Sequence, residues 1–240
     1  MRTACLSSLI VVGLMSLLQG QAAAEPARKV VELFTSQGCN SCPPADRLAA
    51  ELARDPGNVL ISLPVDYWDY LGWKDSYAKP VFTARQKAYA RARGDMQVYT
   101  PQAVVDGVTH AVGSDNEAID TAVSAPLAVP VTGTISGDQL HVDVAASSGK
   151  TKDAQVWLVP IISAASVAIG RGENAGATVT YTNIARDLRK LGDWKGEARK
   201  FDVATADIRK LDADGAAILL QASNGGLPGE ILGATIVKLK

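Results

Sequence analysis

Two cysteines stand three positions apart in the segment LFTSQGCNSCPP, residues 33–44, and two prolines follow them directly. The remaining cysteine, Cys5, lies near the start of the chain. Thiols at this spacing suit three kinds of site: a structural disulfide, a metal site, or a redox pair that exchanges disulfides with other thiols. The size of the closed loop, the number of other ligands and the position of the pair in the fold distinguish the three.

A structural disulfide between Cys39 and Cys42 would contribute little stability. Cross-linking residues so close together removes on the order of 2 kcal/mol of chain entropy, against roughly 3 kcal/mol for a 15-residue loop. Zinc needs three or four protein ligands, and the two histidines, His110 and His141, are far apart in the sequence. We therefore expect no metal cofactor, although a two-thiolate Cu(I) site stays open because soft thiolates suit that ion.

The redox interpretation follows from the position of the pair. An apolar strand is expected just before Cys39, and Pro43 and Pro44 suit the first turn of a helix, where their missing N–H groups are not needed. Cys39 would then lie at the helix N-terminus, whose free N–H groups and dipole stabilise a thiolate. We expect Cys39 to be the attacking sulfur, open to solvent, and Cys42 to resolve the mixed disulfide.

A second motif, Thr100-Pro101 in the segment VYTPQAVVDG, comes directly before a predicted strand and hairpin. Together with the Cys-x-x-Cys pair, it makes residues 29–125 resemble the thioredoxin superfamily. That resemblance implies that Pro101 is cis and faces Cys39. It also implies that the backbone at Thr100 is free to pair with an extended peptide. Taken alone, Thr100-Pro101 would equally suit an ordinary turn.

Glu32 interrupts an apolar strand candidate, VVELF. An acid is rarely tolerated unpaired inside a sheet that is covered on both faces. Relative to the cysteines, Glu32 falls near the buried acid of thioredoxins, with one extra residue, Gly38, in the intervening loop. One hypothesis makes its carboxylate the acceptor of the Cys42 proton. The alternative is a structural carboxylate paired with Arg or Lys.

An aromatic and acidic segment, PVDYWDYLGWKDSYAKP, covers residues 64–80. It follows the second predicted strand, and parallel strands end at one edge of a sheet, where sites in such folds tend to form. Tyr67, Trp68, Tyr70 and Trp73 would then line a groove beside Cys39. Of these, Tyr67, Trp68 and Trp73 are expected to bind substrate together with Thr100. The alternative is that these rings pack between a loop and a neighbouring domain.

Strand-like and helix-like runs alternate up to about residue 124, which is an α/β order. We expect strands over 30–34, 59–65, 102–105 and 108–112, and helices over 44–54, 81–93 and 116–124. After Pro126 and Pro130, short strand-like runs cover 131–136, 140–145, 155–162, 177–184, 197–203, 216–221 and 231–239, which is typical of a sandwich. Residues 187–190 suit either a strand or one helical turn. We predict an α/β thioredoxin-like domain over 25–126 followed by an all-β sandwich-like domain over 127–240.

The first 24 residues have the order of a secretory signal peptide: Arg2, an apolar run over 9–18, then three alanines. We therefore expect an exported protein, periplasmic or secreted, with a signal peptide over 1–24. The apolar run is shorter than the ~20 residues that a membrane span needs, so no span is expected. The 24 Lys and Arg nearly balance the 25 Asp and Glu without a long run of one sign, so nucleic acid is not an expected partner.

Longer segments narrow the resemblance to a family of exported bacterial proteins of unknown function with a thioredoxin-like fold. The segments are FTSQGCNSCPPAD, VDYWDYLGWKD, FTARQKAY, VYTPQAVVDG and RGENAGATVTYTNIARDLRKLGDW. Relatives commonly carry a histidine before Val-Asp-Tyr-Trp, where this chain has Pro64, so no acid–base or metal role is expected there. RGENAG lacks the Lys-Ser/Thr of a phosphate loop, and its Arg171 and Glu173 suit a docking pair or a solvated turn.

The preferred functional hypothesis is an exported thiol-disulfide oxidoreductase that acts on protein or peptide thiols. No motif indicates its redox partner. The expected reacting residues are Cys39, Cys42, Pro101 and Glu32, with Thr100, Tyr67, Trp68 and Trp73 shaping a peptide groove. The alternative is a non-catalytic binding protein of the thioredoxin fold that uses the two thiols for Cu(I) or keeps them as a stable disulfide.

Overall fold

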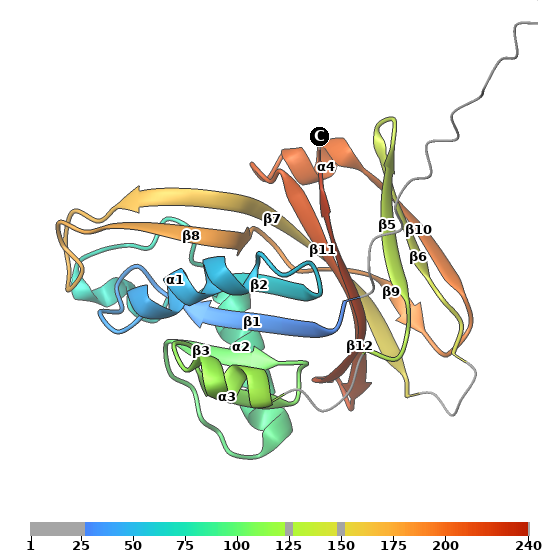
Figure 1. Ribbon diagram of the computed structural model, residues 1–240, viewed down its shortest axis with the longest axis horizontal. Helices are drawn as coiled ribbons and strands as arrows, with labels where there is room; N and C mark the ends of the chain where they lie inside the picture. Colours follow the sequence, from blue (N-terminus) through green and yellow to red (C-terminus); the bar gives the residue numbers. More distant parts are fainter. Residues whose placement is uncertain (1–26, 123–126, 148–151, 240) are drawn as a thin grey trace, which may run out of the picture.

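The computed structural model describes residues 27–122, 127–147 and 152–239 (Figure 1). Two predictions fall outside these ranges. The signal peptide over 1–24 and the domain boundary at residue 126 both concern residues that the structure does not describe.

One mixed sheet of nine strands runs through both halves of the chain, in the order β12-β11-β7-β8-β2-β1-β3-β4, with β9 paired to β7. The first half supplies β1 (Lys29–Thr35), β2 (Asn58–Pro64), β3 (Gln102–Val105) and β4 (Thr109–Val112). The second half supplies β7 (Ala154–Ala168), β8 (Thr178–Ala185), β9 (Arg189–Trp194), β11 (Gly215–Asn224) and β12 (Leu227–Lys238). Strands β1 and β2 are parallel, as expected, and β3 is antiparallel to β1.

The two halves join where β8 lies parallel to β2, at the register Ser62↔Ile184. Two side chains reinforce this joint. The Ser62 hydroxyl donates to the carbonyl oxygen of Thr182 at 2.8 Å, and the Asn183 amide donates to that of Leu60 at 3.0 Å. Asn183 has φ of 47°, a conformation that Asn tolerates better than most residues. The joint makes the sheet continuous from one half to the other.

A second, three-stranded sheet packs on the end of the large sheet that β11 and β12 form (Figure 1). Its strands are β5 (Val131–Ser136), β6 (Gln139–Val144) and β10 (Arg199–Ala204). Leu140 and Val142 of β6 belong to the same apolar core as Val156 of β7 and Leu220 of β11. Packing of sheet on sheet is therefore present, but one of its two layers is the sheet shared with the first half.

The predicted fold class, an α/β thioredoxin-like domain followed by a separate all-β sandwich, is wrong. Strands dominate the described residues, and the large sheet draws on both halves of the chain. Alternating patterns locate strands, but they do not identify a strand's neighbours, because the unpaired N–H and C=O groups of one edge resemble those of any other edge. β2 was expected to belong to a separate first domain, whereas it pairs with β8 from the second half of the chain.

The two long helices cover opposite faces of the sheet. Along β1, Val31 and Leu33 pack in one core with the alanines of α1 (Pro43–Leu52). Val30 and Phe34 pack in another core with Phe82 of α2 (Pro80–Arg93). This division follows from the alternation of side chains along a strand. It determines which residues of β1 can reach the cysteine pair.

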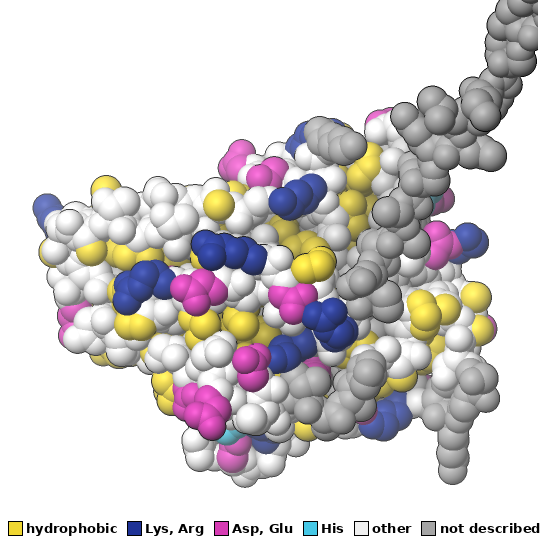
Figure 2. Space-filling view, in the orientation of Figure 1, with side chains coloured by type: hydrophobic (Ala, Val, Ile, Leu, Met, Phe, Trp, Pro, Cys, Tyr) yellow, Lys and Arg dark blue, Asp and Glu magenta, His cyan; other side chains and the backbone are white. Residues whose placement is uncertain are grey.

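The remaining helices are short: α3 (Asn116–Thr121), α4 (Thr205–Arg209) and a 3-10 turn, η1 (Asp69–Leu71). Lys and Arg side chains are interspersed with Asp and Glu over the face in Figure 2, as the balanced composition predicts. Within the described ranges, no helix combines the length and the apolar character needed to cross a membrane.

Candidate functional site

Cys39 and Cys42 form a disulfide in the loop that leads from β1 to α1, with their Cα atoms 5.4 Å apart. Both cysteines are buried, with 1% and 0% of their surface exposed. The two residues between them, Asn40 and Ser41, are exposed. The disulfide therefore lies directly beneath the surface, and the expectation that Cys39 is open to solvent is wrong for this closed state.

Helix α1 begins at Pro43 with Cys42 as its N-cap residue, so Cys39 lies outside the helix. Pro43 and Pro44 carry no N–H group, and the next two N–H groups of the turn, those of Ala45 and Asp46, both donate to the carbonyl oxygen of Cys42 at 2.8 and 3.1 Å. The placement of Cys39 at the helix N-terminus is therefore wrong. The prolines start the helix as expected, but they also remove donors that would have faced a thiolate.

The Ser41 hydroxyl connects the disulfide to the Thr-Pro segment. Its oxygen lies 3.4 Å from Cys39 Sγ and 3.4 Å from the carbonyl oxygen of Thr100, to which it donates. The indole N–H of Trp68 donates to the Thr100 hydroxyl at 2.8 Å. Thr100 is thus held at two atoms, its carbonyl oxygen by Ser41 and its hydroxyl by Trp68.

The Thr100–Pro101 peptide bond is cis, and Pro101 is buried. Gly113 makes room for this turn. A Cβ at Gly113 would lie 3.0 Å from that of Pro101, 3.2 Å from that of Ala45 and 2.6 Å from a methyl group of Leu33. The segment after β4 therefore packs directly on Pro101 and on the first turn of α1.

The aromatic segment divides into two parts. Tyr67 and Trp68 lie together, with ring centroids 6.1 Å apart, beside Thr100. Trp73 turns away and packs with Ile169 and Tyr181 of the β7–β8 hairpin. The alternative interpretation, packing between a loop and the second half of the chain, therefore describes Trp73. Tyr67 and Trp68 remain the candidates for a wall beside the cysteine pair.

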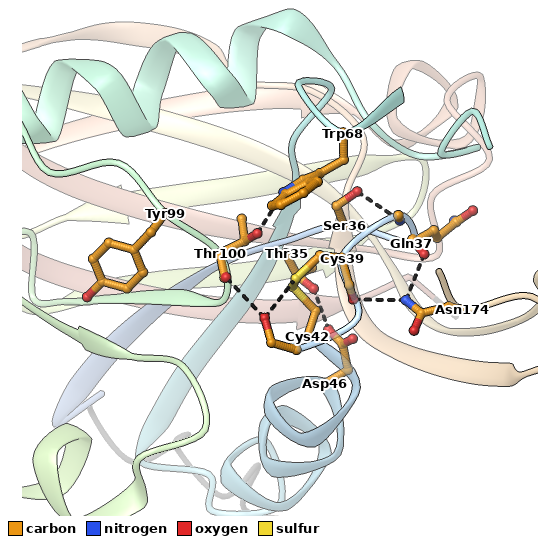
Figure 3. The surroundings of a disulfide bond; sticks show 12 residues. Thr35, Ser36, Gln37, Cys39, Cys42, Asp46, Trp68, Tyr99, Thr100 and Asn174 are labelled. Atoms are coloured by element: carbon orange, nitrogen blue, oxygen red, sulfur yellow. Dashed lines mark hydrogen bonds between the residues drawn. A yellow bond between two sulfur atoms is a disulfide. The ribbon is translucent and has the colours of Figure 1, made fainter. Parts of the chain in front are cut away.

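The loop between β7 and β8 closes over the cysteine segment. The Asn174 amide donates to the carbonyl oxygens of Gln37 and Cys39 at 2.9 and 2.8 Å, as Figure 3 shows. Trp73 donates to the side-chain oxygen of Gln37 at 2.9 Å. Arg171 and Glu173, the two residues named from the sequence, are exposed. Their neighbour Asn174 is the residue of RGENAG that contacts the site.

Glu32 lies on the other face of the sheet, and the hypothesis that it accepts the Cys42 proton fails on this geometry. Its carboxylate accepts two hydrogen bonds from Arg85, at 2.6 and 3.0 Å, and a third from the Tyr89 hydroxyl. Gln221 of β11 completes the network by accepting from Arg85 at 3.0 Å and donating to Tyr89 at 2.7 Å. The alternative, a carboxylate paired with Arg, is confirmed.

Asp46 is the buried acid beside the cysteines, and the sequence analysis missed it. It has 1% of its surface exposed, and its Oδ1 accepts from the Thr35 hydroxyl at 2.8 Å. Oδ2 has no hydrogen-bond partner among the described residues. Burial, and to a smaller extent nearby Asp75, raise the pKa of Asp46 to about 7, although the Thr35 hydrogen bond lowers it. The signal in the sequence is its spacing, four residues after Cys42 in a helix.

Two more titratable side chains stand near Asp46. Asp75 is buried and accepts from the backbone N–H groups of Gln37, Tyr77 and Ala78, yet burial still raises its pKa. Burial also raises the pKa of Tyr181 on β8, and the charges of Asp46 and Asp75 add to the effect. Among the described residues, no group of three or more His, Cys, Asp or Glu side chains is placed to hold a metal ion.

The sequence profile of a family described as protein of unknown function (DUF1223) matches residues 30–221. The chain belongs to the DUF1223 family. Its fold is similar to the crystal structure of protein AGR_C_4864 from Agrobacterium tumefaciens, with 35% identity and a TM-score of 0.82 over 91% of this chain and 97% of that one. Family membership confirms the expected resemblance to proteins of unknown function.

A more distant structure is similar to the DUF1223 chain in fold alone. HBP35 of Porphyromonas gingivalis shares 11% identity and a TM-score of 0.59 over 89% of this chain and 76% of that one. No curated protein matches the sequence. The function therefore has to be argued from the site itself.

Proposed function

We propose that the chain is an exported thiol-disulfide oxidoreductase whose reacting group is the Cys39–Cys42 pair. One observation carries the proposal: a single exposed side chain, Ser41, touches both Cys39 Sγ and the carbonyl oxygen of Thr100. The sulfur that we propose to react and a backbone group suited to pairing with an extended peptide thus both contact one side chain. The resemblance of the two motifs to the thioredoxin superfamily and the signal-like N-terminus add support.

The exchange needs no cofactor, because the electrons pass between sulfur atoms. A client thiolate attacks Cys39 Sγ, the Cys39–Cys42 bond breaks, and Cys42 leaves as a thiolate that takes up a proton. A second client thiolate then attacks the client sulfur and releases Cys39. The client has lost two electrons and gained a disulfide, and the protein holds two thiols. The reverse sequence reduces a client disulfide.

Burial of the disulfide defines what must move before exchange. The Ser41 side chain lies over Cys39 Sγ, and the Asn174 side chain holds the same segment through two carbonyl oxygens. A client peptide that offers an N–H group to the Thr100 carbonyl oxygen would replace the Ser41 hydroxyl there. Displacing a hydrogen bond of 3.4 Å costs little, because such a contact is at the weak end of hydrogen-bond geometry.

A second candidate is a binding protein that keeps the two cysteines as a stable disulfide or, when reduced, binds Cu(I). Burial of both sulfurs favours a stable disulfide, since protection from thiolates slows exchange. The two candidates differ in what glutathione does: an oxidoreductase equilibrates with it, whereas a protected disulfide does not.

Reduction and trapping distinguish the candidates. Oxidised protein is incubated with glutathione buffers, and the fraction of free thiols is counted by mass spectrometry after alkylation. We expect equilibration within minutes, and catalysed reduction of insulin by dithiothreitol. The Cys42→Ser variant should accumulate a glutathione mixed disulfide on Cys39, while Cys39→Ser, the matched control, should not. A disulfide that resists glutathione for hours, or reduced protein that only binds Cu(I) stoichiometrically, would overturn the proposal.

A further inference from the structure

The first turn of α1 places a carboxyl group behind the inner cysteine. Residues four apart on a helix lie on one face, and the later side chain leans back over the earlier one. Asp46 therefore projects toward Cys42, and its backbone N–H donates to the Cys42 carbonyl oxygen at 3.1 Å. Figure 3 shows the Asp46 carboxyl beneath the disulfide, beside Thr35.

This carboxyl group is costly to keep as a structural feature. A buried polar atom left without a partner costs about 1–3 kcal/mol, and more when it is charged. Asp46 has one oxygen bonded to Thr35 and the other without a partner in the part of the chain that the structure describes, although only 1% of the residue is exposed. By contrast, two other buried acids, Glu32 and Asp75, have both oxygens bonded. A carboxyl oxygen that no described residue bonds, in the helix turn that follows Cys42, is available to exchange a proton with the Cys42 thiol.

We propose that Asp46 accepts the proton of Cys42 when Cys42 attacks a mixed disulfide, and returns it when Cys42 leaves. The inference rests on the oxidoreductase function proposed above. In the forward step, the Cys42 thiol gives its proton to Asp46 Oδ2, directly or through one water, and its sulfur attacks Cys39 Sγ. The Cys39–client bond breaks, the client leaves as a thiolate, and Asp46 later releases the proton to solvent.

The surroundings of Asp46 keep it suited to this exchange. Thr35 donates to it from β1, and Arg47 on its own helix lowers its pKa. Asp75 raises it, and Tyr181 faces the same region from β8. Because burial dominates and raises the pKa to about 7, the group is close to half protonated near neutral pH. That is the condition under which one carboxyl group both accepts and donates protons efficiently.

The test separates the two sulfurs with 5,5′-dithiobis(2-nitrobenzoate). Reduced protein releases one nitrothiobenzoate when Cys39 attacks the reagent and a second when Cys42 resolves the mixed disulfide. Both phases are followed by stopped-flow absorbance over pH 5–9. In Asp46→Asn we expect the second phase to slow about 100-fold at pH 7. Its rate should then rise only near the ordinary cysteine pKa of about 8.5.

The first phase should be unchanged, and so should both phases of Glu51→Gln, an exposed carboxylate on the same helix. A second phase with unaltered rate and pH profile in Asp46→Asn, or equal slowing of both phases, would overturn the role of Asp46 while leaving the oxidoreductase function intact. Wild-type protein that releases no second nitrothiobenzoate would overturn both.

A measurement on the folded wild type guards against a variant that fails to fold. The carboxyl carbon of Asp46 is followed by NMR as a function of pH in reduced protein and in reduced Cys42→Ala. A carboxyl that exchanges protons with Cys42 must change its titration midpoint when that thiol is removed. An identical midpoint in the two proteins would contradict the proposal.

Discussion

Two buried carboxylates lie on opposite faces of one sheet, and their surroundings differ. Glu32, on the α2 face, has its charge matched by Arg85 and both of its oxygens bonded. Asp46, on the α1 face, has a single side-chain hydrogen bond and no ion pair among the described residues. A paired and fully bonded charge holds structure together, whereas an incompletely bonded carboxyl remains free to change protonation. We therefore connect the first face with stability and, under the proposed function, the second face with proton exchange.

Both regions are completed by an amide from the second half of the chain. Gln221 of β11 accepts from Arg85 and donates to Tyr89, and Asn174 of the β7–β8 loop binds the carbonyl oxygens of Gln37 and Cys39. Neither network could be satisfied by residues 27–122 alone. The second half is therefore part of each region, and the continuous sheet is what brings it there.

The largest expected effect on stability comes from breaking the Glu32–Arg85 ion pair on the α2 face. Arg85→Met leaves the Glu32 carboxylate buried without its partner, and breaking a buried ion pair typically costs about 3–5 kcal/mol. We expect a loss of this size in the free energy of unfolding, measured by urea denaturation of the oxidised protein. Arg91→Met, an exposed arginine on the same helix, is the control and should cost under about 0.5 kcal/mol.

Replacing both partners tests whether the charge or the packing is responsible. Glu32→Leu combined with Arg85→Leu removes the uncompensated charge and should recover most of the loss, because apolar replacements of buried pairs are often nearly neutral. Loss of stability in the double variant equal to that of Arg85→Met would show that packing alone matters. The charge pair would then not explain the stability of the α2 face, and the contrast with the α1 face would fail.

The second effect concerns the pH dependence of stability on the α1 face. Asp46 has its folded-state pKa raised from 3.8 to about 7, so the folded protein binds this proton more tightly than the unfolded chain. Well below pH 3.8 both states are protonated and the group has no net effect on stability. As the pH rises toward 7, the unfolded chain loses the proton first, and stability falls by up to about 4 kcal/mol.

Asp46→Asn removes that titration. We expect the difference in free energy of unfolding between variant and wild type to shift in favour of the variant by up to about 4 kcal/mol from pH 4 to pH 8. Urea denaturation at four pH values measures it, with Glu51→Gln as the control whose difference stays flat. A difference in free energy of unfolding that does not change with pH for Asp46→Asn would mean that folding does not raise the pKa of Asp46.

Much of the local structure was predictable from the sequence. The first two strands, the two long helices and the β3–β4 hairpin lie within a few residues of the expected ranges, because apolar alternation and proline positions determine such elements locally. The sequence pattern does not predict β9 or α4. Over 187–190 it suits either a strand or one helical turn. The joint between β2 and β8 was not predictable, since it depends on one parallel register with few local signals.

The candidate site was predictable in part. The cysteine pair, Thr100 and Trp68 do come together. Glu32 was misassigned because a strand pattern gives two faces without saying which one the next helix covers. Its real partner, Arg85, lies 53 positions away. Asp46, in contrast, could have been predicted. A helix that starts at the prolines places the fourth residue after Cys42 on the same side of the helix as Cys42.

The smallest expected effect is that of replacing Asn174 or Gln221, the two amide side chains from the second half of the chain. Asn174→Ala removes two hydrogen bonds to backbone carbonyl oxygens. Gln221→Ala removes three, with Arg85, Tyr89 and the carbonyl oxygen of Gly229. At about 0.5–1.5 kcal/mol for each hydrogen bond, both variants should lose about 1–4 kcal/mol in the free energy of unfolding. Urea denaturation of the oxidised proteins measures this loss, which alone would not distinguish the two regions.

Reduction of the disulfide by dithiothreitol does distinguish them. Asn174 holds the backbone of Cys39 itself, so Asn174→Ala should loosen the cover over the sulfur and speed reduction several-fold. Gln221→Ala should leave that rate unchanged, because Gln221 bonds the Glu32 network on the opposite face. Glu173→Ala, an exposed neighbour of Asn174, controls for general disturbance of the loop. Equal rates in Asn174→Ala and Gln221→Ala would mean that access to Cys39 depends on overall stability, and the functional division between the two faces would fail.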